Sequence, residues 1–236
     1  MNNIYKSFLA VFSTTLLTAQ DPAWMNKPAA EWTDEDAKQV LDNSPWSGVA
    51  TVTFLAGKDE DKMREGGKWG SDRPAAPFSA IGQHILTGVG GTPYVYKTPD
   101  PPSLRVLWGS ALPVRTAELK LGATGISDWE GKYYVLAVFG VPSDMADVKS
   151  PRRDGLIHGL KQMATLRLDQ KRILKPARVE ILSTGDTTSS VIYLFPRTQE
   201  ITKKDVRVAF VAQINRLYVS QYFYPPQMLL EDKVEL

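Results

Sequence analysis

The pattern of apolar and polar positions is clearest in residues 104–121. Alternate positions carry large apolar side chains, as expected of a strand with one covered face: Leu104, Val106 and Trp108. Pro113 follows a short break, and proline favours the first turn of a helix because it lacks an amide hydrogen and has a fixed φ. Gly122 stands where a helix C-terminal cap is expected. The segment therefore predicts a strand, a tight connection and a helix of about two turns, with Trp108 and Leu112 in the core.

A second helix is predicted to begin after Thr33. Threonine is a favourable N-cap, Asp36 stands at the capping-box position, and acidic residues 34–36 lie at the positive end of the helix dipole. The apolar spacing predicts a buried face made of Ala37, Val40 and Leu41. The helix should end before Pro45, because the residue that precedes a proline avoids the helical conformation. A further helix is expected from Asp154, with apolar positions on one side: Leu156, Ile157, Leu160, Met163 and Ala164.

Strand-like segments dominate the second half of the chain. Lys132–Val141 is the most apolar of them and is predicted to be central in its sheet. Six more follow: Leu166–Leu168, Arg178–Leu182, Val191–Phe195, Val206–Ile214, Leu217–Tyr224 and Met228–Leu236. Asn215-Arg216 is predicted to form a tight hairpin turn. Two strands are expected earlier, at Val49–Leu55 and Phe78–Leu86. The pattern therefore predicts an α+β fold, with a mostly antiparallel sheet concentrated in the C-terminal half and two or three short helices.

The N-terminus has the pattern of a secretory signal peptide. Lys6 precedes an apolar run of about a dozen residues, Ser7–Ala19, which is the length of a signal-peptide core and too short to cross a bilayer as a helix. No cysteine follows this run, so a lipid-anchored lipoprotein is excluded. We therefore expect residues 1–19 to be removed and residues 20–236 to form one domain without a transmembrane segment. Residues near 57–77, rich in charged residues, glycine and proline, are predicted to form a mobile surface loop.

Composition narrows the possible compartment and chemistry. The 28 basic and 26 acidic residues of the 236 nearly balance, and no basic stripe indicates nucleic-acid binding. The chain has no cysteine, which excludes disulfides, thiol nucleophiles, iron–sulfur clusters and thiolate zinc sites. An exported chain without disulfides fits a bacterial envelope, in the periplasm or outside the cell.

Local motifs for catalysis are few. Ser110 lacks the G-x-S-x-G spacing of a nucleophile elbow, and His158 is expected on the solvent side of its helix. Residues 59–61 lack the spacing of a calcium loop. Asp128 and Glu130 flank a tryptophan and resemble the carboxylate pair of a glycosidase, although they lie between glycines in a segment that favours a turn. No metal site or cofactor is predicted.

A row of tyrosines is the candidate binding surface. Alternate positions of the predicted strand Leu217–Tyr224 place these side chains on one face: Tyr218, Tyr222 and Tyr224. Such a row can stack on sugars or contact a protein partner. More often, such a row simply covers cross-strand neighbours in the sheet.

Two patches resemble an uncharacterised family of exported bacterial proteins. They are the helix end Asn43-Ser44-Pro45-Trp46 and the run from Arg105 to Arg115, RVLWGSALPVR. Tyr133–Pro142 and Leu194–Arg197 are similar to that family as well. The resemblance spans most of the chain after the signal peptide. It implies export and a single domain, and it transfers no activity and no functional residue.

Together these observations predict an exported, non-enzymatic binding or interaction module. Its partner would be a protein or glycan of the cell envelope, or a small apolar ligand. The alternative is a hydrolase that uses Asp and Glu side chains to act on envelope or extracellular glycans, because such chemistry needs no local motif.

Overall fold

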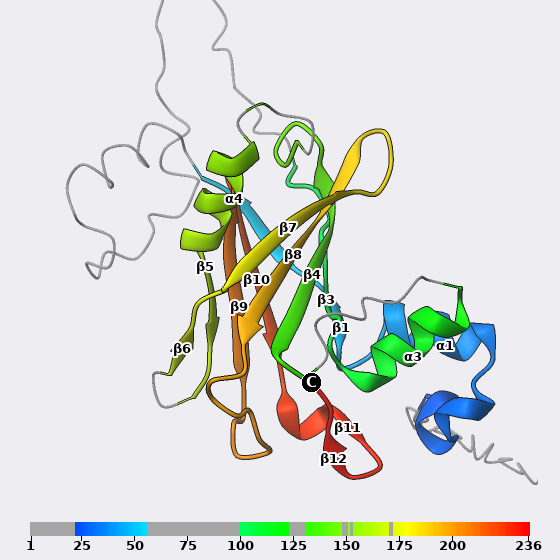
Figure 1. The fold of residues 1–236 in the computed structure, drawn as a ribbon. Helices are drawn as coiled ribbons and strands as arrows, with labels where there is room; N and C mark the ends of the chain where they lie inside the picture. Colours follow the sequence, from blue (N-terminus) through cyan, green and yellow to red (C-terminus); the bar gives the residue numbers. More distant parts are fainter. Residues whose placement is uncertain (1–21, 56–99, 123–130, 148–150, 152, 170–171) are drawn as a thin grey trace, which may run out of the picture.

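Two antiparallel sheets stack face to face in the computed structural model, which describes residues 22–55, 100–122, 131–147, 151, 153–169 and 172–236 (Figure 1). Sheet A contains, in spatial order, β1 (Ser47–Val49), β3 (Arg105–Trp108), β4 (Tyr133–Pro142), β8 (Thr188–Pro196) and β7 (Arg178–Ser183). Sheet B contains β2 (Thr51–Phe54), β10 (Leu217–Phe223), β9 (Val208–Ile214), β5 (Ala164–Arg167) and β6 (Ile173–Leu174). Most strands lie in the C-terminal half, which confirms the predicted α+β fold.

The main core lies between the two sheets. The ring of Tyr193 in sheet A meets that of Phe210 in sheet B at a centroid distance of 5.3 Å, and Trp108 meets Phe223 at 5.0 Å. Trp108 is fully buried, as predicted. The apolar strand β4 lies between β3 and β8, which confirms its central place. The turn at 215–216 joins β9 to β10 and confirms the predicted hairpin.

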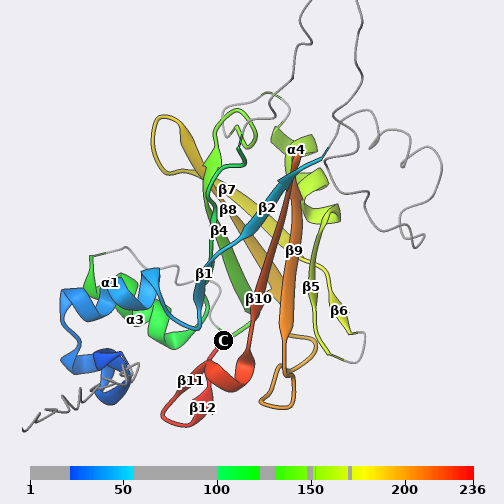
Figure 2. The ribbon, with the colours of Figure 1, turned by 180° about the vertical axis from the view of Figure 1, so that it is seen from behind.

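Helices lie on two sides of the sandwich (Figure 1). Helix α1 (Asp34–Asp42) packs beside α3 (Leu112–Lys120) next to the β1 edge of sheet A, and both views of the ribbon agree on this (Figures 1 and 2). Three buried tryptophans gather at the N-terminal side of this helix pair: Trp24, Trp32 and Trp46. Helix α4 (Arg153–Gln162) contacts β7 of sheet A and β9 of sheet B. The sandwich is therefore bordered by helices on both sides.

The predicted capping box at the start of α1 is present. The Thr33 hydroxyl accepts a hydrogen bond from the Asp36 amide at 3.1 Å, and the Asp36 carboxylate accepts one from the Thr33 amide at 2.9 Å. The Lys27 ammonium adds an ion pair to the same carboxylate at 3.0 Å. The Thr33 amide, the Lys27 ammonium and the Thr33 hydroxyl lower the pKa of Asp36 from 3.8 to about 2. The carboxylate is thus held ionised while it fixes the first turn of the helix.

The prediction of one strand over Val49–Leu55 is wrong. The segment belongs to two short strands in different sheets, since β1 pairs with β3 and β2 pairs with β10. Ala50 lies between them, is buried, and donates its amide hydrogen to the Leu104 carbonyl at 2.9 Å. The chain crosses from one sheet to the other at this point, a change that an unbroken run of strand-forming residues does not reveal.

Three smaller predictions also need correction. Leu112 is 43% exposed rather than buried, because α3 turns Pro113, Val114 and Ala117 towards the core. Ala164 begins β5 instead of extending the helical face. The C-terminal segment is not one strand: a 3-10 helix (η5, Pro225–Gln227) precedes a hairpin of β11 (Leu229–Leu230) and β12 (Lys233–Val234). The predicted signal peptide, the loop near 57–77 and the strand Phe78–Leu86 lie outside the described residues.

Candidate functional site

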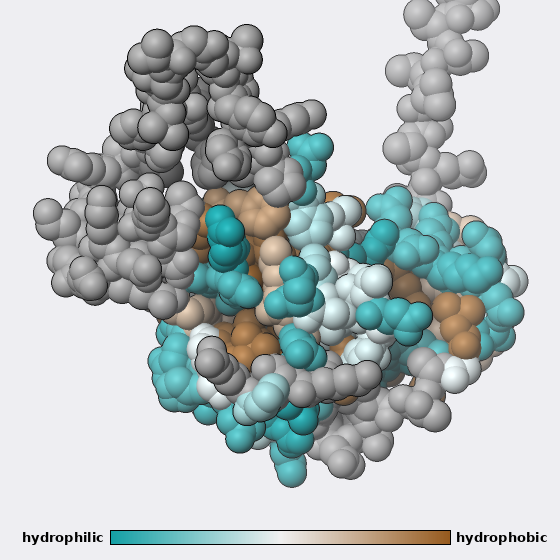
Figure 3. All heavy atoms as spheres, turned by 90° about the horizontal axis from the view of Figure 1, so that it is seen from above, coloured by the Kyte–Doolittle hydropathy of each residue, from teal (hydrophilic) through white to brown (hydrophobic). Residues whose placement is uncertain are grey.

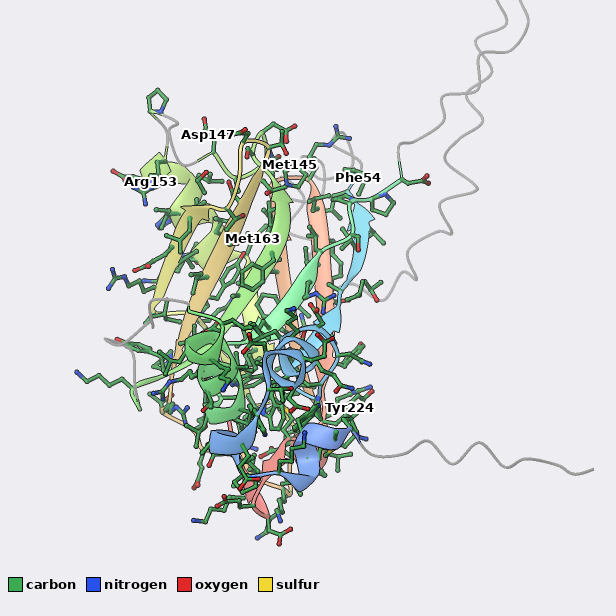
Figure 4. The ribbon with its side chains drawn as sticks, turned by 90° about the vertical axis from the view of Figure 1, so that its right-hand side faces the viewer. Phe54, Met145, Asp147, Arg153, Met163 and Tyr224 are labelled. Atoms are coloured by element: carbon green, nitrogen blue, oxygen red, sulfur yellow. The ribbon has the colours of Figure 1, made fainter. Side chains whose placement is uncertain are left out.

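The tyrosine row lies on the outer face of sheet B. Along β10 the inward side chains are buried in the core, as the alternation predicts: Leu217, Val219 and Phe223. Tyr218 and Tyr222 point the other way, and Tyr222 is 48% exposed. Four residues of strand separate their Cα atoms by roughly 13 Å. Tyr224 is exposed too, but it lies beyond the end of β10, below the part of the strand that pairs with β9 (Figure 4).

Small and hydroxyl-bearing side chains surround the two tyrosines. The register places Gln213 opposite Tyr218 and Ala209 opposite Tyr222 on β9. On the other side, β2 places Thr53 beside Tyr218. The remaining outward positions of β2, β10, β9 and β5 near them are Thr51, Ser220, Val211 and Thr165. Apart from Gln213, the positions next to the two tyrosine rings therefore carry short side chains.

Three cations border this face. Arg207 precedes β9, and its guanidinium carbon lies 4.8 Å from the centre of the Tyr222 ring. Arg167 of β5 is exposed and lies opposite Ala209. Lys175, which follows β6, donates a hydrogen bond from its ammonium to the Gln162 carbonyl at 2.9 Å. None of the outward positions of sheet B that the structure describes carries a carboxylate.

Two carboxylates at the lower end of sheet B, Asp169 and Asp205, have other partners. Asp169, just past β5, accepts hydrogen bonds from the amides of Val206 and Arg207. Asp205 is buried and pairs with the guanidinium of Arg172. Both carboxylates therefore hold the loops at the lower end of sheet B and lie at the margin of the tyrosine face.

Two adjoining hollows lie at the upper part of this face. One, of about 170 Å³, is lined by side chains of β5, β9 and β10 and their neighbours: Gln162, Met163, Thr165, Arg167, Lys175, Val211, Gln213 and Tyr218. The other, of about 240 Å³, lies between α4 and the β9–β10 turn: Gly155, Leu156, Gly159, Leu160, Met163, Gln213 and Asn215. Met163 and Gln213 line both hollows. Neither hollow is lined by a carboxylate or a histidine. The hollow over β5 and β9 offers hydrogen bonds, positive charge from Arg167 and Lys175, and apolar contact, whereas the hollow beside α4 offers only hydrogen bonds and apolar contact.

The upper end of the sandwich is partly apolar. Phe54, Met145 and Met163 lie towards this end (Figure 4), and the first two are half-buried against the core. Seen from above, apolar surface gathers near the middle of this end and is bordered by hydrophilic side chains (Figure 3). The hollow beside α4 therefore opens near an apolar rim.

The other candidate residues do not join the tyrosine face. The Ser110 hydroxyl accepts a hydrogen bond from the Val135 amide at 3.0 Å, which is a structural role in the turn between β3 and α3. His158 is exposed on α4, as predicted. Asp128 and Glu130 lie outside the described residues. Within the described part of the chain, no three histidine or acidic side chains are grouped closely enough to hold a metal ion.

Sequence reasoning found the tyrosines but missed the residues around them. Arg167, Lys175, Arg207 and Gln213 come from other strands or loops, and only the register brings them beside β10. A partial signal was present, because Thr165 and Arg167 alternate with the apolar residues of β5. The sequence does not show which strands are neighbours in the sheet, so it could not bring these residues together.

Comparison with known proteins adds no relative. No family model, no curated protein and no solved structure matches this chain. The resemblance to exported bacterial proteins therefore stays a prediction. In the described ranges, none of the helices has the length and apolar character needed to span a bilayer.

Proposed function

We propose that this chain is an exported, non-enzymatic binding module of the bacterial envelope, and that it holds its ligand on the outer face of sheet B. The observation that carries the proposal is the exposed Tyr222, with the half-buried Tyr218 on the same face, among neighbours that are mostly short and in part carry hydroxyls. Aromatic rings raised above a flat sheet provide stacking surfaces with a polar end, as sugar and protein ligands require.

The simpler interpretation is that the tyrosines cover neighbouring side chains. For Tyr222 this interpretation has little support, because the residue opposite is an alanine and about half of the tyrosine surface faces solvent, 48% of it. The contact with Arg207 orients the ring without burying it. An aromatic side chain that is oriented and exposed is available for a ligand.

Affinity electrophoresis in gels that contain soluble polysaccharides tests the binding face. We expect the migration of the wild-type protein to be retarded, and both Tyr218→Ala and Tyr222→Ala to lose most of the retardation. Leu119→Ala is the control, since Leu119 is 61% exposed on α3, away from sheet B. Equal retardation of wild type and the two tyrosine variants would place the ligand elsewhere and refute this face.

The same polysaccharides test the alternative hydrolase. A binding module leaves them intact, whereas a hydrolase based on Asp128 and Glu130 would release reducing ends that both Asp128→Asn and Glu130→Gln abolish. Export is tested separately by N-terminal sequencing of the protein from the envelope fraction. We expect the chain to begin at Gln20, and an intact residue 1–19 segment would contradict cleavage there.

A further inference from the structure

We propose that the ligand of the outer face of sheet B is an acidic glycan whose sugar rings carry carboxylates, in other words a polyuronate. The proposal presupposes the binding face described above and adds the ligand's charge and class. Three cations lie at this face, Arg167, Lys175 and Arg207, whereas the described strands of sheet B carry no outward carboxylate, and the carboxylate of Asp169 at its margin already accepts hydrogen bonds from the Val206 and Arg207 amides. Such one-sided charge favours an anionic partner.

The cations retain the capacity to bind a ligand. In the part of the chain that the structure describes, Arg167 has neither an ion pair nor a hydrogen bond through its guanidinium. Lys175 donates one hydrogen bond to the Gln162 carbonyl, and an ammonium group has three donors. Arg207 contacts the Tyr222 ring, an arrangement that leaves its in-plane N–H groups free to point at an acceptor.

The spacing across the sheet suits one sugar ring. Tyr222, Ala209 and Arg167 lie side by side on β10, β9 and β5. Neighbouring strands are about 4.8 Å apart, so the Cα atoms of Tyr222 and Arg167 lie roughly 10 Å apart with only a methyl group between them. A sugar ring placed over Ala209 would therefore have the aromatic ring of Tyr222 on one side for stacking and the guanidinium of Arg167 on the other for a negative charge.

The position of the charge favours a carboxylate on the ring over a phosphate between rings. The guanidinium carbon of Arg207 is 4.8 Å from the centre of the Tyr222 ring, so charge recognition and stacking occur at the same place. A uronic acid carries its carboxylate on the ring that stacks, and a guanidinium can bind a carboxylate through two N–H groups. A phosphodiester would place the charge beside the ring that stacks, in the linkage to the next unit.

An acidic peptide fits this face less well than a glycan. Extended peptides add to sheets at exposed edges, where backbone groups are unpaired. Here the backbones of β9 and β10 already pair on both sides. The face instead carries side-chain hydroxyls that can form hydrogen bonds with the hydroxyls of a sugar: Thr51, Thr53, Thr165 and Ser220.

Polygalacturonate and its fully methyl-esterified form test the inference, because they share sugar and linkage and differ in charge. We expect wild type to bind the acid at least tenfold more tightly than the ester in isothermal titration calorimetry, with an affinity that falls as salt rises. Both Arg167→Gln and Arg207→Gln should weaken binding of the acid about tenfold or more. Arg178→Gln is the matched control: it removes an exposed arginine from β7 of sheet A and should leave the affinity unchanged.

Each other outcome overturns the inference in a distinguishable way. Equal binding of acid and ester, lost in Tyr222→Ala, would refute the acidic ligand and leave the glycan-binding face intact. Binding of polyglutamate but of neither polysaccharide, lost in Arg167→Gln, would make the partner an acidic peptide. If Arg178→Gln weakens binding of the acid as much as Arg167→Gln does, the affinity depends only on the net charge of the protein, and the inference is refuted. Absence of binding to all three probes would refute the polyuronate, while retardation by other polysaccharides that depends on Tyr218 and Tyr222 would still support the binding face.

Discussion

The two outer faces of the sandwich follow the same alternation and have opposite chemistry. On sheet A four outward residues at the centre of β4 and β8 are apolar and at most 5% exposed: Val135, Ala137, Ile192 and Leu194. On sheet B the corresponding strands present tyrosine, serine and glutamine beside exposed arginine. A strand that is apolar on both sides is built to be buried on both sides, whereas strict alternation leaves one side for solvent or a ligand. The outer face of sheet A is therefore structural, whereas the outer face of sheet B is available to a ligand.

A matched pair of valines gives the largest expected contrast between the faces. Val135→Ala removes two buried methyl groups from sheet A and should lower the free energy of unfolding by about 2 kcal/mol, from lost burial and the cavity left behind. Val211→Ala, on the half-buried outer face of sheet B, should cost less than about 1 kcal/mol. Urea unfolding followed by circular dichroism measures both. Equal losses would mean that the two faces are equally structural.

The capping box of α1 lies on neither outer face, so its contribution to acid unfolding is a reference for the comparison. The pKa of Asp36 is about 2 in the folded chain, below its ordinary value of 3.8, so its contribution to stability is complete above about pH 4 and disappears as the pH falls towards 2. Thr33→Ala removes the capping hydroxyl and should cost about 1 kcal/mol at neutral pH. Asp36→Asn should flatten the loss of stability between pH 4 and 2, measured as urea midpoints.

The outcome of those acid titrations bears on the comparison as well. Because Asp36 lies on α1 and no described outward position of the strands of sheet B carries a carboxylate, Asp36→Asn leaves the charges of the binding face unchanged. An unchanged pH dependence in Asp36→Asn would contradict the role given to the capping box. It would also mean that other groups dominate acid unfolding.

Local signals in the sequence predict most helices and strands. The errors arise where an element depends on which strands pair with it. The capping box at Thr33 and Asp36, the apolar run of β4 and the hairpin at 215–216 each depend on neighbours within a few residues. The split of Val49–Leu55 between two sheets depends on β3 and β10, which lie more than 50 residues further along the chain. The candidate site shows the same division, because the tyrosines share one strand whereas Arg167 and Arg207 reach them only through strand pairing.

The smallest expected difference in the free energy of unfolding is between the loss of a paired arginine on sheet A and the loss of an unpaired one on sheet B. Arg178 lies 2.5 Å from the Glu180 carboxylate on β7, an exposed pair of the kind that contributes a few tenths of a kcal/mol, so Arg178→Ala should cost at most about 0.5 kcal/mol. Arg167→Ala removes one of three like charges and no ion pair, so stability should stay within about 0.3 kcal/mol of wild type. Raising the salt concentration should shrink the cost of Arg178→Ala, because it screens the pair. A loss of stability in Arg167→Ala larger than in Arg178→Ala would reveal a structural partner for Arg167 and remove it from the set of cations available to a ligand.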